Sequence, residues 1–463
     1  MGTDNGGHMY LELNPDEHLY IQIYESIKNK IISGEISEGF KLPSIRALSG
    51  ECLVSKNTVS NAYYQLEIEG YISAIEKVGF FVNKTDHLVQ LPSQTDALPT
   101  TQISPIYNFS YSGVDSSSFP FSIWKRVFRE TIDYDETLLK QGDPKGLYEL
   151  RNSIANYLYN SRGIQTTADD IIISAGTEHL FYLLRRLFNS DTVYGFEDPG
   201  YAWGNEFFTY DIEHCSAIPL DDSGIRVDEL VKSNVDICLV TPAHQFPTGI
   251  VMTTSRRYEL LNWAKSGRYI IEDDYDGDFK FSGRPTPSLK SIDSNDSVIY
   301  MGSFSKCLTP ALRISYMILP KDLMQIYNEA FSGFGCPCSV FIQSALSKFI
   351  KDGYFEKHIN RMRQLYSKKH MKMLSLLKGI KGIKVQEPHS GTSFSVEVDT
   401  ELNSNEFAKL ALKHGVGITP VDRFSHNGVK RNMYLLGFTG MDTSDIETGL
   451  QILDDIISKK RRI

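Results

Sequence analysis

The chain has 463 residues, more than one hydrophobic core usually organises, so its length predicts two or three domains and excludes a single small fold. Hydrophobic residues make up 41% and charged residues 23%, a composition that excludes a disordered or fibrous chain. The formal net charge of −9 argues against indiscriminate binding to nucleic acid or to an anionic membrane, and it requires any basic surface to be local.

Cysteine usage and hydropathy indicate in which cellular compartment the protein is expected. Six cysteines are present, and only Cys336 and Cys338 lie close together in the sequence, so the spacing predicts neither a metal site nor a disulfide framework. We therefore expect reduced thiols in a cytoplasmic protein. No apolar run approaches the roughly 18 residues that span a bilayer, so a membrane is not expected as a partner. Residues 1–8 (MGTDNGGH) look like an appended leader and are left out of the predicted fold.

Residues 9–84 are predicted to form a small domain of short helices. Its first helix carries apolar side chains at helical spacing, at Tyr20, Ile23, Ile27 and Ile31. A second helix starts within residues 42–48 (LPSIRAL), where a proline occupies the first turn. After a turn, residues 54–66 (VSKNTVSNAYYQL) predict a third helix with Ser55 as its N-cap. One face of this third helix is apolar and consists of Val59, Ala62, Tyr63 and Leu66.

The third predicted helix presents polar and basic side chains to solvent. The residues that point outward near its start are Lys56, Asn57, Thr58 and Asn61. Two short helices joined by a tight turn, with such residues on the second, are typical of a recognition helix that enters the major groove of DNA. Residues 70–73 (GYIS) and 78–82 (VGFFV) then predict the hairpin, or wing, that closes the domain.

The succession LPSIRxL, VSKNTV, AYxxL, EGYI and GFFV resembles the winged helix-turn-helix of the GntR transcription factors and covers nearly all of residues 9–84. The resemblance implies contacts with double-stranded DNA at six positions, Ser44, Arg46, Lys56, Asn57, Thr58 and the wing around Gly79. These residue types suit that role. Arg46 and Lys56 can bind phosphate or guanine, the hydroxyls can donate to phosphate, and Asn57 can reach a base edge.

The charge of this domain leaves an alternative open. Residues 9–84 contain seven Lys and Arg against ten Asp and Glu, a net charge of −3, whereas many DNA-binding domains are basic. Lys56 and Asn57 could therefore only solvate a helix start in a winged helix that binds protein. The completeness of the motif favours DNA, and the acidity predicts modest nonspecific binding and dependence on dimerisation for affinity.

Residues 85–106 (TDHLVQLPSQTDALPTTQISPI) predict a linker, because they are rich in Thr, Ser, Pro and Gln and lack a sustained period. In residues 107–463, short β-branched runs alternate with helix-like stretches. The clearest runs cover residues 170–174, 235–240, 269–272 and 297–300. Such alternation predicts an α/β domain with a mainly parallel sheet.

The strongest chemical signal in the second domain follows a predicted strand, at residues 302–316 (GSFSKCLTPALRISY). Lys306 can form an imine with a phosphorylated aldehyde, and Ser303, Ser305 and Arg313 flank it. Ser303 can bind the phosphate through its hydroxyl and Arg313 through paired, charge-assisted hydrogen bonds. A Ser-x-Ser-Lys match is weak alone, so the prediction depends on motifs upstream.

Two upstream motifs supply complementary groups. Residues 270–276 (IIEDDYD) place acids and a tyrosine directly after an apolar strand, where α/β sheets bind ligands, although a solvated strand end is the alternative. The segment ISAGTEHLFYLL passes from strand to helix through small residues. Backbone N–H groups at such a helix start attract phosphate, which makes Gly176, Thr177 and Glu178 candidate contacts.

Tyr201, in the turn EDPGY, and the loop TPAHQFPTG complete the set of motifs. Tyr201 can stack on an aromatic cofactor, although simple packing is the commoner role for such a tyrosine. Taken in order, these five motifs resemble the fold type I aminotransferases, from about residue 107 to about residue 450. The resemblance implies pyridoxal 5'-phosphate held by Lys306 as a Schiff base, with Asp273 at the pyridine nitrogen and Tyr275 at the ring hydroxyl.

The sequence departs from the aminotransferase pattern at three positions. Phe246 stands where an asparagine usually bonds the ring hydroxyl, and Gln141 stands where a tyrosine reaches the neighbouring subunit's phosphate. Leu435 replaces the arginine that binds the substrate carboxylate, which removes a charge-assisted pair of about 1.5–3 kcal/mol. Nearby cations that could compensate are Arg423, Lys430 and Arg431, but surface charge is the commoner role of such residues.

The two domains together resemble the MocR branch of the GntR transcription factors, which includes members that sense pyridoxal phosphate. This resemblance implies a homodimer whose cofactor domain sets how two winged helices meet an operator. We expect pyridoxal 5'-phosphate, alone or with a small amino compound, to act as effector through the Lys306 imine. Because of Leu435, we expect at most residual transaminase activity. We expect no metal site. The alternative is an active aminotransferase with a DNA-binding appendage.

Overall fold

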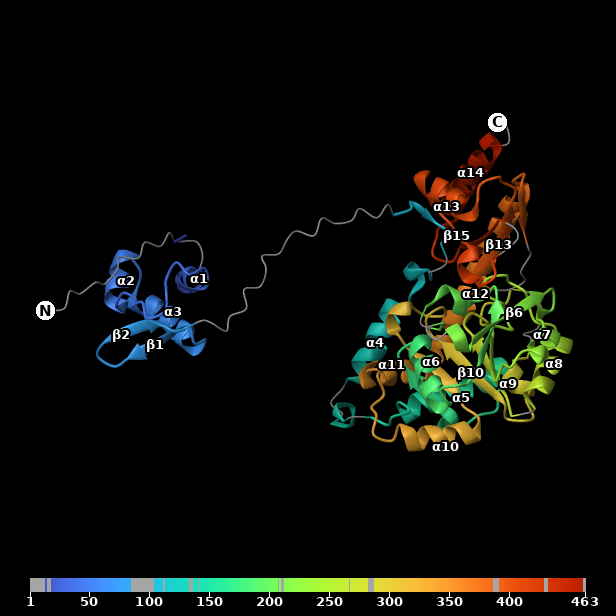
Figure 1. Ribbon diagram of the computed structural model, residues 1–463, viewed down its shortest axis with the longest axis horizontal. Helices are drawn as coiled ribbons and strands as arrows, with labels where there is room; N and C mark the ends of the chain where they lie inside the picture. The colour runs from blue at the N-terminus through green and yellow to red at the C-terminus, as the bar shows by residue number, and fades with distance from the viewer. Residues whose placement is uncertain are drawn as a thin grey trace. The chain divides into compact units, whose positions relative to one another are not determined.

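The structure is a computed structural model in which the chain forms two compact units, Met1–Thr101 and Gln102–Ile463 (Figure 1). It describes residues 13–14, 18–84, 104–110, 113–132, 136–140, 142–206, 208–209, 212–265, 267–281, 287–385, 391–428 and 432–460. The boundary between the units falls within the predicted linker. Of that linker, residues 104–106 are described, and the remainder lies outside the described residues.

The first unit is a winged helix-turn-helix, as its sequence predicts. Its elements are α1 (Leu19–Ile32), α2 (Ile45–Glu51), α3 (Lys56–Ile68), β1 (Ile72–Ile75) and β2 (Gly79–Val82). Ser44 and Ser55 cap α2 and α3, each accepting a hydrogen bond from a backbone N–H three residues on. The predicted apolar face of α3 is buried, and so are three residues of the stripe on α1, whereas Tyr20 is 42% exposed. β1 and β2 pair antiparallel as the wing.

An eight-stranded, mainly parallel sheet forms the centre of the second unit. Its strands in spatial order are β4 (Ile171–Ser174), β11 (Ser315–Ile318), β10 (Val298–Ser303), β9 (Tyr269–Asp274), β8 (Ile237–Val240), β5 (Tyr194–Asp198), β6 (Cys215–Asp221) and β7 (Gly224–Ile225). Strands β10, β9, β8, β5 and β6 pair in parallel. β11 is antiparallel to both β10 and β4, so β4 runs in the same direction as the central strands.

Helices cover both faces of this sheet (Figure 1). They are α4 (Phe121–Thr131), α5 (Tyr148–Arg162), α6 (Thr177–Leu187), α7 (Val227–Lys232), α8 (Thr254–Ala264), α9 (Leu289–Ile292), α10 (Lys321–Ala330), α11 (Val340–Lys351) and α12 (Tyr354–Gly379). Alternate strand residues serve the two faces: Ile171 and Ile173 pack in a core with α5 and α11, whereas Ile172 packs in another core with α6 and α10. Burial on both faces explains the continuous β-branched runs in the sequence.

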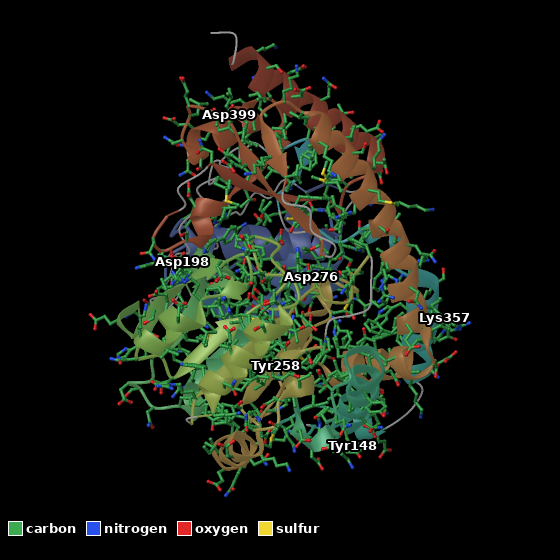
Figure 2. The ribbon with its side chains drawn as sticks, turned by 90° about the vertical axis from the view of Figure 1, so that its right-hand side faces the viewer. Tyr148, Asp198, Tyr258, Asp276, Lys357 and Asp399 are labelled. Carbon is green, nitrogen blue, oxygen red and sulfur yellow. The ribbon has the colours of Figure 1, made fainter. Side chains whose placement is uncertain are left out.

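The C-terminal part of this unit adds a small antiparallel sheet, ordered β12 (Ile383–Val385), β13 (Ser393–Val398), β16 (Met433–Gly437) and β15 (Thr419–Pro420). α13 (Ser404–Lys413) and α14 (Thr443–Lys460) accompany it, and β14 (Val416–Gly417) pairs with β3 (Tyr107–Asn108). In Figure 2, Asp276 lies between the part of the unit that carries Tyr258 and the part that carries Asp399. None of the described helices is long and apolar enough to cross a membrane.

Candidate functional site: a cavity at the carboxyl ends of the strands

The sheet topology explains why motifs far apart in the sequence meet. Strands β4, β5, β8, β9 and β10 run in the same direction, so their carboxyl ends share one edge of the sheet. Each of the five motifs contains the carboxyl end of one of these strands or directly follows it. Ligands of α/β proteins bind at this edge, because side chains and helix starts converge there.

A cavity of about 440 Å³ opens at this edge, and all ten residues predicted for the cofactor line it. They are Gly176, Thr177, Glu178, Tyr201, Asp273, Tyr275, Ser303, Ser305, Lys306 and Arg313. Thr241, Phe246 and Pro310 complete the lining. The volume suits a small ligand, and the lining combines aromatic rings with a few polar groups, which is typical of cofactor sites.

Lys306 follows β10 and is set to act as a nucleophile. Burial lowers the pKa of its amine from 10.5 to about 8, while the negative charge of Asp276 opposes this shift. A substantial fraction of the amine is therefore neutral near physiological pH, and the neutral form is the one that attacks an aldehyde.

Asp273, near the end of β9, is 7% exposed. Burial, with the neighbouring charges of Asp274 and Asp276, raises the pKa of its carboxyl from 3.8 to about 7. A cation beside this carboxylate would offset the shift. The protonated pyridine nitrogen of pyridoxal phosphate is a group of this kind, so the side chain fits the predicted cofactor.

The opposite end of the cavity is built for an anion. Gly176 precedes α6 with φ +100, and a Cβ there would lie 2.4 Å from Nη2 of Arg313. Arg313 itself has a left-handed backbone with φ 49, and its guanidinium donates to the carbonyl of Ala175 at 3.2 Å. Ser303 and Ser305 hydrogen-bond through their hydroxyls at 2.9 Å. Helix start, guanidinium and hydroxyls are the groups that bind phosphate.

A buried network behind Tyr275 escaped the sequence prediction. The phenol of Tyr275 donates to the backbone carbonyl of His244 at 3.0 Å and lies 2.9 Å from its Nδ1. Nδ1 of His244 also lies 3.0 Å from Asp276, and both side chains are almost fully buried. His244 lies three residues before Pro247 of the Pro-Thr-Gly loop, which was the only signal in the sequence. The network fixes the phenol that the resemblance assigns to the ring hydroxyl.

The three departures from the aminotransferase pattern have different outcomes. Phe246 lines the cavity, with its ring centroid 5.8 Å from that of Tyr201 and 6.1 Å from that of Tyr275, so it supplies an apolar wall rather than an amide. Gln141 lies outside the described residues. Leu435 is fully buried on β16, opposite Ser395 and between the core residues of its strand, so it faces away from that core.

Leu435 lies where the small sheet meets the Pro-Thr-Gly loop. Ser395, its cross-strand partner, donates a hydrogen bond to the carbonyl of Pro247 in the Pro-Thr-Gly loop. The small sheet therefore packs against that loop at this point. Arg423 is exposed in the short helix Val421–Phe424 and is not among the residues that line the cavity. Lys430 and Arg431 lie outside the described residues.

The predicted DNA-contacting residues gather at the helix starts and the wing of the first unit. Ser44, Arg46, Lys56 and Asn57 are exposed, and Thr58 is half-buried. Hydroxyls at the start of α3 bond to each other, Ser55 to Thr58, at 2.8 Å. Gly79 begins β2 with φ +137, a conformation that glycine adopts readily.

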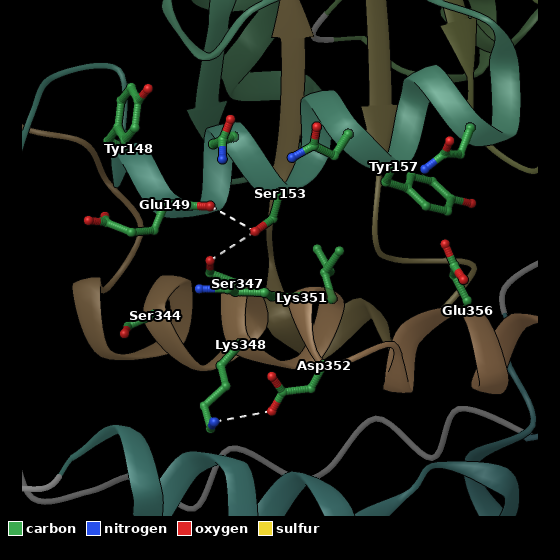
Figure 3. Close-up of a pocket in the computed structure, with 14 residues that line it drawn as sticks. Tyr148, Glu149, Ser153, Tyr157, Ser344, Ser347, Lys348, Lys351, Asp352 and Glu356 are labelled. Carbon is green, nitrogen blue, oxygen red and sulfur yellow. Dashed lines mark hydrogen bonds and ion pairs between the residues drawn. The ribbon is translucent and has the colours of Figure 1, made fainter.

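A second cavity of about 650 Å³ lies between α5, α11 and the start of α12 (Figure 3). Its walls are polar, and their groups bond to each other: Ser153 with Ser347 at 3.1 Å, and Lys348 with Asp352 at 3.1 Å. None of the residues predicted for the cofactor lines it. Tyr148 and Tyr157 also line this second cavity, but it does not lie at the carboxyl ends of the strands.

Both parts of the chain match described families. Residues 111–452 match the family "Aminotransferase class I and II", and residues 19–82 match "Bacterial regulatory proteins, gntR family". The uncharacterized HTH-type transcriptional regulator YdeL of Bacillus subtilis (strain 168) is 38% identical over 96% of this chain and 98% of its own length. The probable rhizopine catabolism regulatory protein MocR of Rhizobium meliloti is 27% identical over 96% and 95%.

Two further similarities bear on the ligand. The HTH-type pyridoxine biosynthesis transcriptional regulator PdxR of Corynebacterium glutamicum is 28% identical over 97% of this chain and 98% of its own length. A crystal structure of kynurenine aminotransferase from Pyrococcus horikoshii, in complex with PMP, superposes with a TM-score of 0.69. That match has 28% identity and covers 77% of this chain and 91% of the enzyme.

Proposed function

Because the chain belongs to the MocR-type transcriptional regulators, which join a GntR helix-turn-helix domain to an aminotransferase domain, we propose that it binds pyridoxal 5'-phosphate at Lys306 and regulates transcription according to that occupancy. The observation that carries the proposal is the cavity at the carboxyl ends of the strands, where all ten predicted cofactor residues meet. Similarity to PdxR, which is named as a regulator of pyridoxine biosynthesis, supports a pyridoxine-derived cofactor as the signal.

Each residue of the cavity has a role in this proposal. Lys306 holds the aldehyde, Asp273 pairs with the ring nitrogen, and Tyr201 and Phe246 enclose the ring. When bound, pyridoxal phosphate supplies an aldehyde that captures amines and a ring that withdraws electrons. Tyr275, fixed by His244, would lie at the ring hydroxyl in place of the missing asparagine and accept a hydrogen bond from it, because the single phenolic hydrogen is donated to the His244 carbonyl. The start of α6, Ser303, Ser305 and Arg313 bind the phosphate.

Sensing is favoured over transamination by the environment of Leu435. An α-carboxylate needs a cation, and Leu435 is a fully buried apolar residue beside the Pro-Thr-Gly loop. We propose that any transamination is residual, and that the effector is the cofactor alone or an amine without an α-carboxylate. Steady-state assays with common α-amino acids should show turnover far below one per second, whereas enzymes typically turn over at about 1–1000 per second. Rapid turnover would contradict this.

The DNA-binding unit completes the proposed function. Lys56 and Asn57 would enter the major groove and Arg46 would bind backbone phosphate. We propose a cytoplasmic homodimer, because two copies of a net-acidic winged helix gain affinity by binding paired half-sites.

An absorbance titration tests the cofactor proposal. Pyridoxal phosphate added to the purified protein should give the visible band of a lysine imine, and Lys306→Ala should abolish that band without unfolding the chain. A matched control is Lys348→Ala, because Lys348 lies in the second cavity. The same saturable band in wild type and Lys306→Ala would refute the proposal.

A further inference from the structure

Glu178 is an acidic residue at the end of the cavity that is built for phosphate. It lies in the first turn of α6, and its Oε2 is 3.3 Å from Nη2 of Arg313. The backbone N–H of Glu178 suits a phosphate, but its carboxylate does not, because like charges repel. The arrangement raises the question of what the carboxylate does there.

Both charged side chains lie beside Gly176, the residue that caps α6. A Cβ on Gly176 would lie 2.4 Å from Nη2 of Arg313 and 3.1 Å from Oε2 of Glu178. Guanidinium and carboxylate therefore both lie over the residue that caps α6. This helix start would attract a phosphate, and the Glu178 carboxylate is an internal anion at the same location.

The cavity lining contains as many acids as cations. Among the residues that line it, the cations are Lys306 and Arg313 and the acids are Glu178 and Asp273. Lys306 is consumed in holding the aldehyde, which leaves Arg313 as the lining cation for a phosphate with up to two negative charges. Its guanidinium is already shared between the carbonyl of Ala175 and the carboxylate of Glu178.

We propose that Glu178 competes with the phosphate of pyridoxal phosphate for Arg313 and thereby keeps occupancy of the site weak and reversible. The inference rests on the proposed function, since a domain that reports cofactor concentration must release its ligand when the concentration falls. A site that binds too tightly would stay filled and could not shift between two states.

The direction of one measurement distinguishes this role of Glu178 from the opposite one. If the carboxylate instead positioned Arg313 for the phosphate, its removal would loosen binding. If it competes, removal tightens binding. Both side chains are partly exposed, so we expect an effect of about five-fold in the dissociation constant, as for a solvent-screened ion pair.

The test is a titration of wild type, Glu178→Gln and Glu178→Ser with pyridoxal phosphate, followed by the imine band. Glu401→Gln, an exposed acid in a turn, is the matched control. Both Glu178 variants should bind about five-fold tighter than wild type and release the cofactor more slowly on dilution. Pyridoxal, which lacks the phosphate, should bind all four proteins equally.

Two results overturn the inference. Equal or weaker binding of pyridoxal phosphate by both Glu178 variants would show that the carboxylate does not compete, and the proposed function would survive as long as wild type forms the band. An equal gain for pyridoxal would show that the effect does not act through the phosphate. Absence of the band in wild type would refute the proposed function itself, and this inference with it.

Discussion

Substitution of Gly176 by alanine should weaken the binding of pyridoxal phosphate in addition to destabilising the fold. The backbone of Gly176, with φ +100 and ψ 165, costs an L-residue about 1–3 kcal/mol, and the new Cβ would lie 2.4 Å from the guanidinium of Arg313. Nη2 is at the end of a flexible side chain, so the guanidinium of Arg313 can move away from the new methyl group. The displaced guanidinium would lose charge-assisted bonds to the phosphate of about 1.5–3 kcal/mol, which lowers affinity for pyridoxal phosphate about 10- to 150-fold.

Gly163 provides the matched control for this substitution. It ends α5 with φ +69, and nothing lies within 4 Å of the position of its missing Cβ. Gly163→Ala should therefore show a similar loss in urea-unfolding free energy and unchanged binding in the absorbance titration. Equal affinities for wild type and Gly176→Ala would refute the assignment of this end of the cavity to the phosphate.

Three further perturbations follow from the same structure. Burial depresses the pKa of Lys306 from 10.5 to about 8, so the folded cofactor-free protein binds fewer protons than the unfolded chain between these values and its stability rises with pH there. Lys306→Met should thus stabilise it at pH 7 by on the order of 3 kcal/mol, a gain that disappears above pH 10.5; equal urea midpoints at pH 7 would contradict this. Leu435→Arg should destabilise the fold by about 3 kcal/mol without restoring transamination, because it buries an unpaired charge; rapid turnover by a stable variant would count against our view of this position. Lys56→Ala should weaken DNA binding with a salt slope smaller by about one, whereas Asn57→Ala should relax base preference instead; unchanged slopes would argue against contact.

The order of motifs was sufficient to predict the architecture and the members of the cavity. Continuous β-branched runs predicted buried parallel strands, and in such a sheet the segments that follow parallel strands must converge. This explains why residues as distant as Gly176 and Arg313 could be placed in one site without coordinates. The caps Ser44 and Ser55 were predictable for a similar reason, since capping depends on residues only three positions away.

Features that depend on packing between segments far apart in the sequence were not predictable. The bonds of His244 with Tyr275 and Asp276 join two loops, and nothing in either segment specifies the distance between them. Burial of Leu435 against the Pro-Thr-Gly loop depends on how the small sheet packs. Tyr20 fits the helical period of α1 yet is 42% exposed, because the buried stripe is narrower than the apolar one.

Cofactor-dependent DNA binding is the most direct test of the central claim. DNA selected from a random pool by the purified full-length protein would serve as the probe, and its binding would be followed by fluorescence anisotropy with and without pyridoxal phosphate. We predict that the cofactor changes DNA affinity or half-site spacing for wild type and has no effect on Lys306→Ala. Identical binding curves for wild type with and without the cofactor would contradict it.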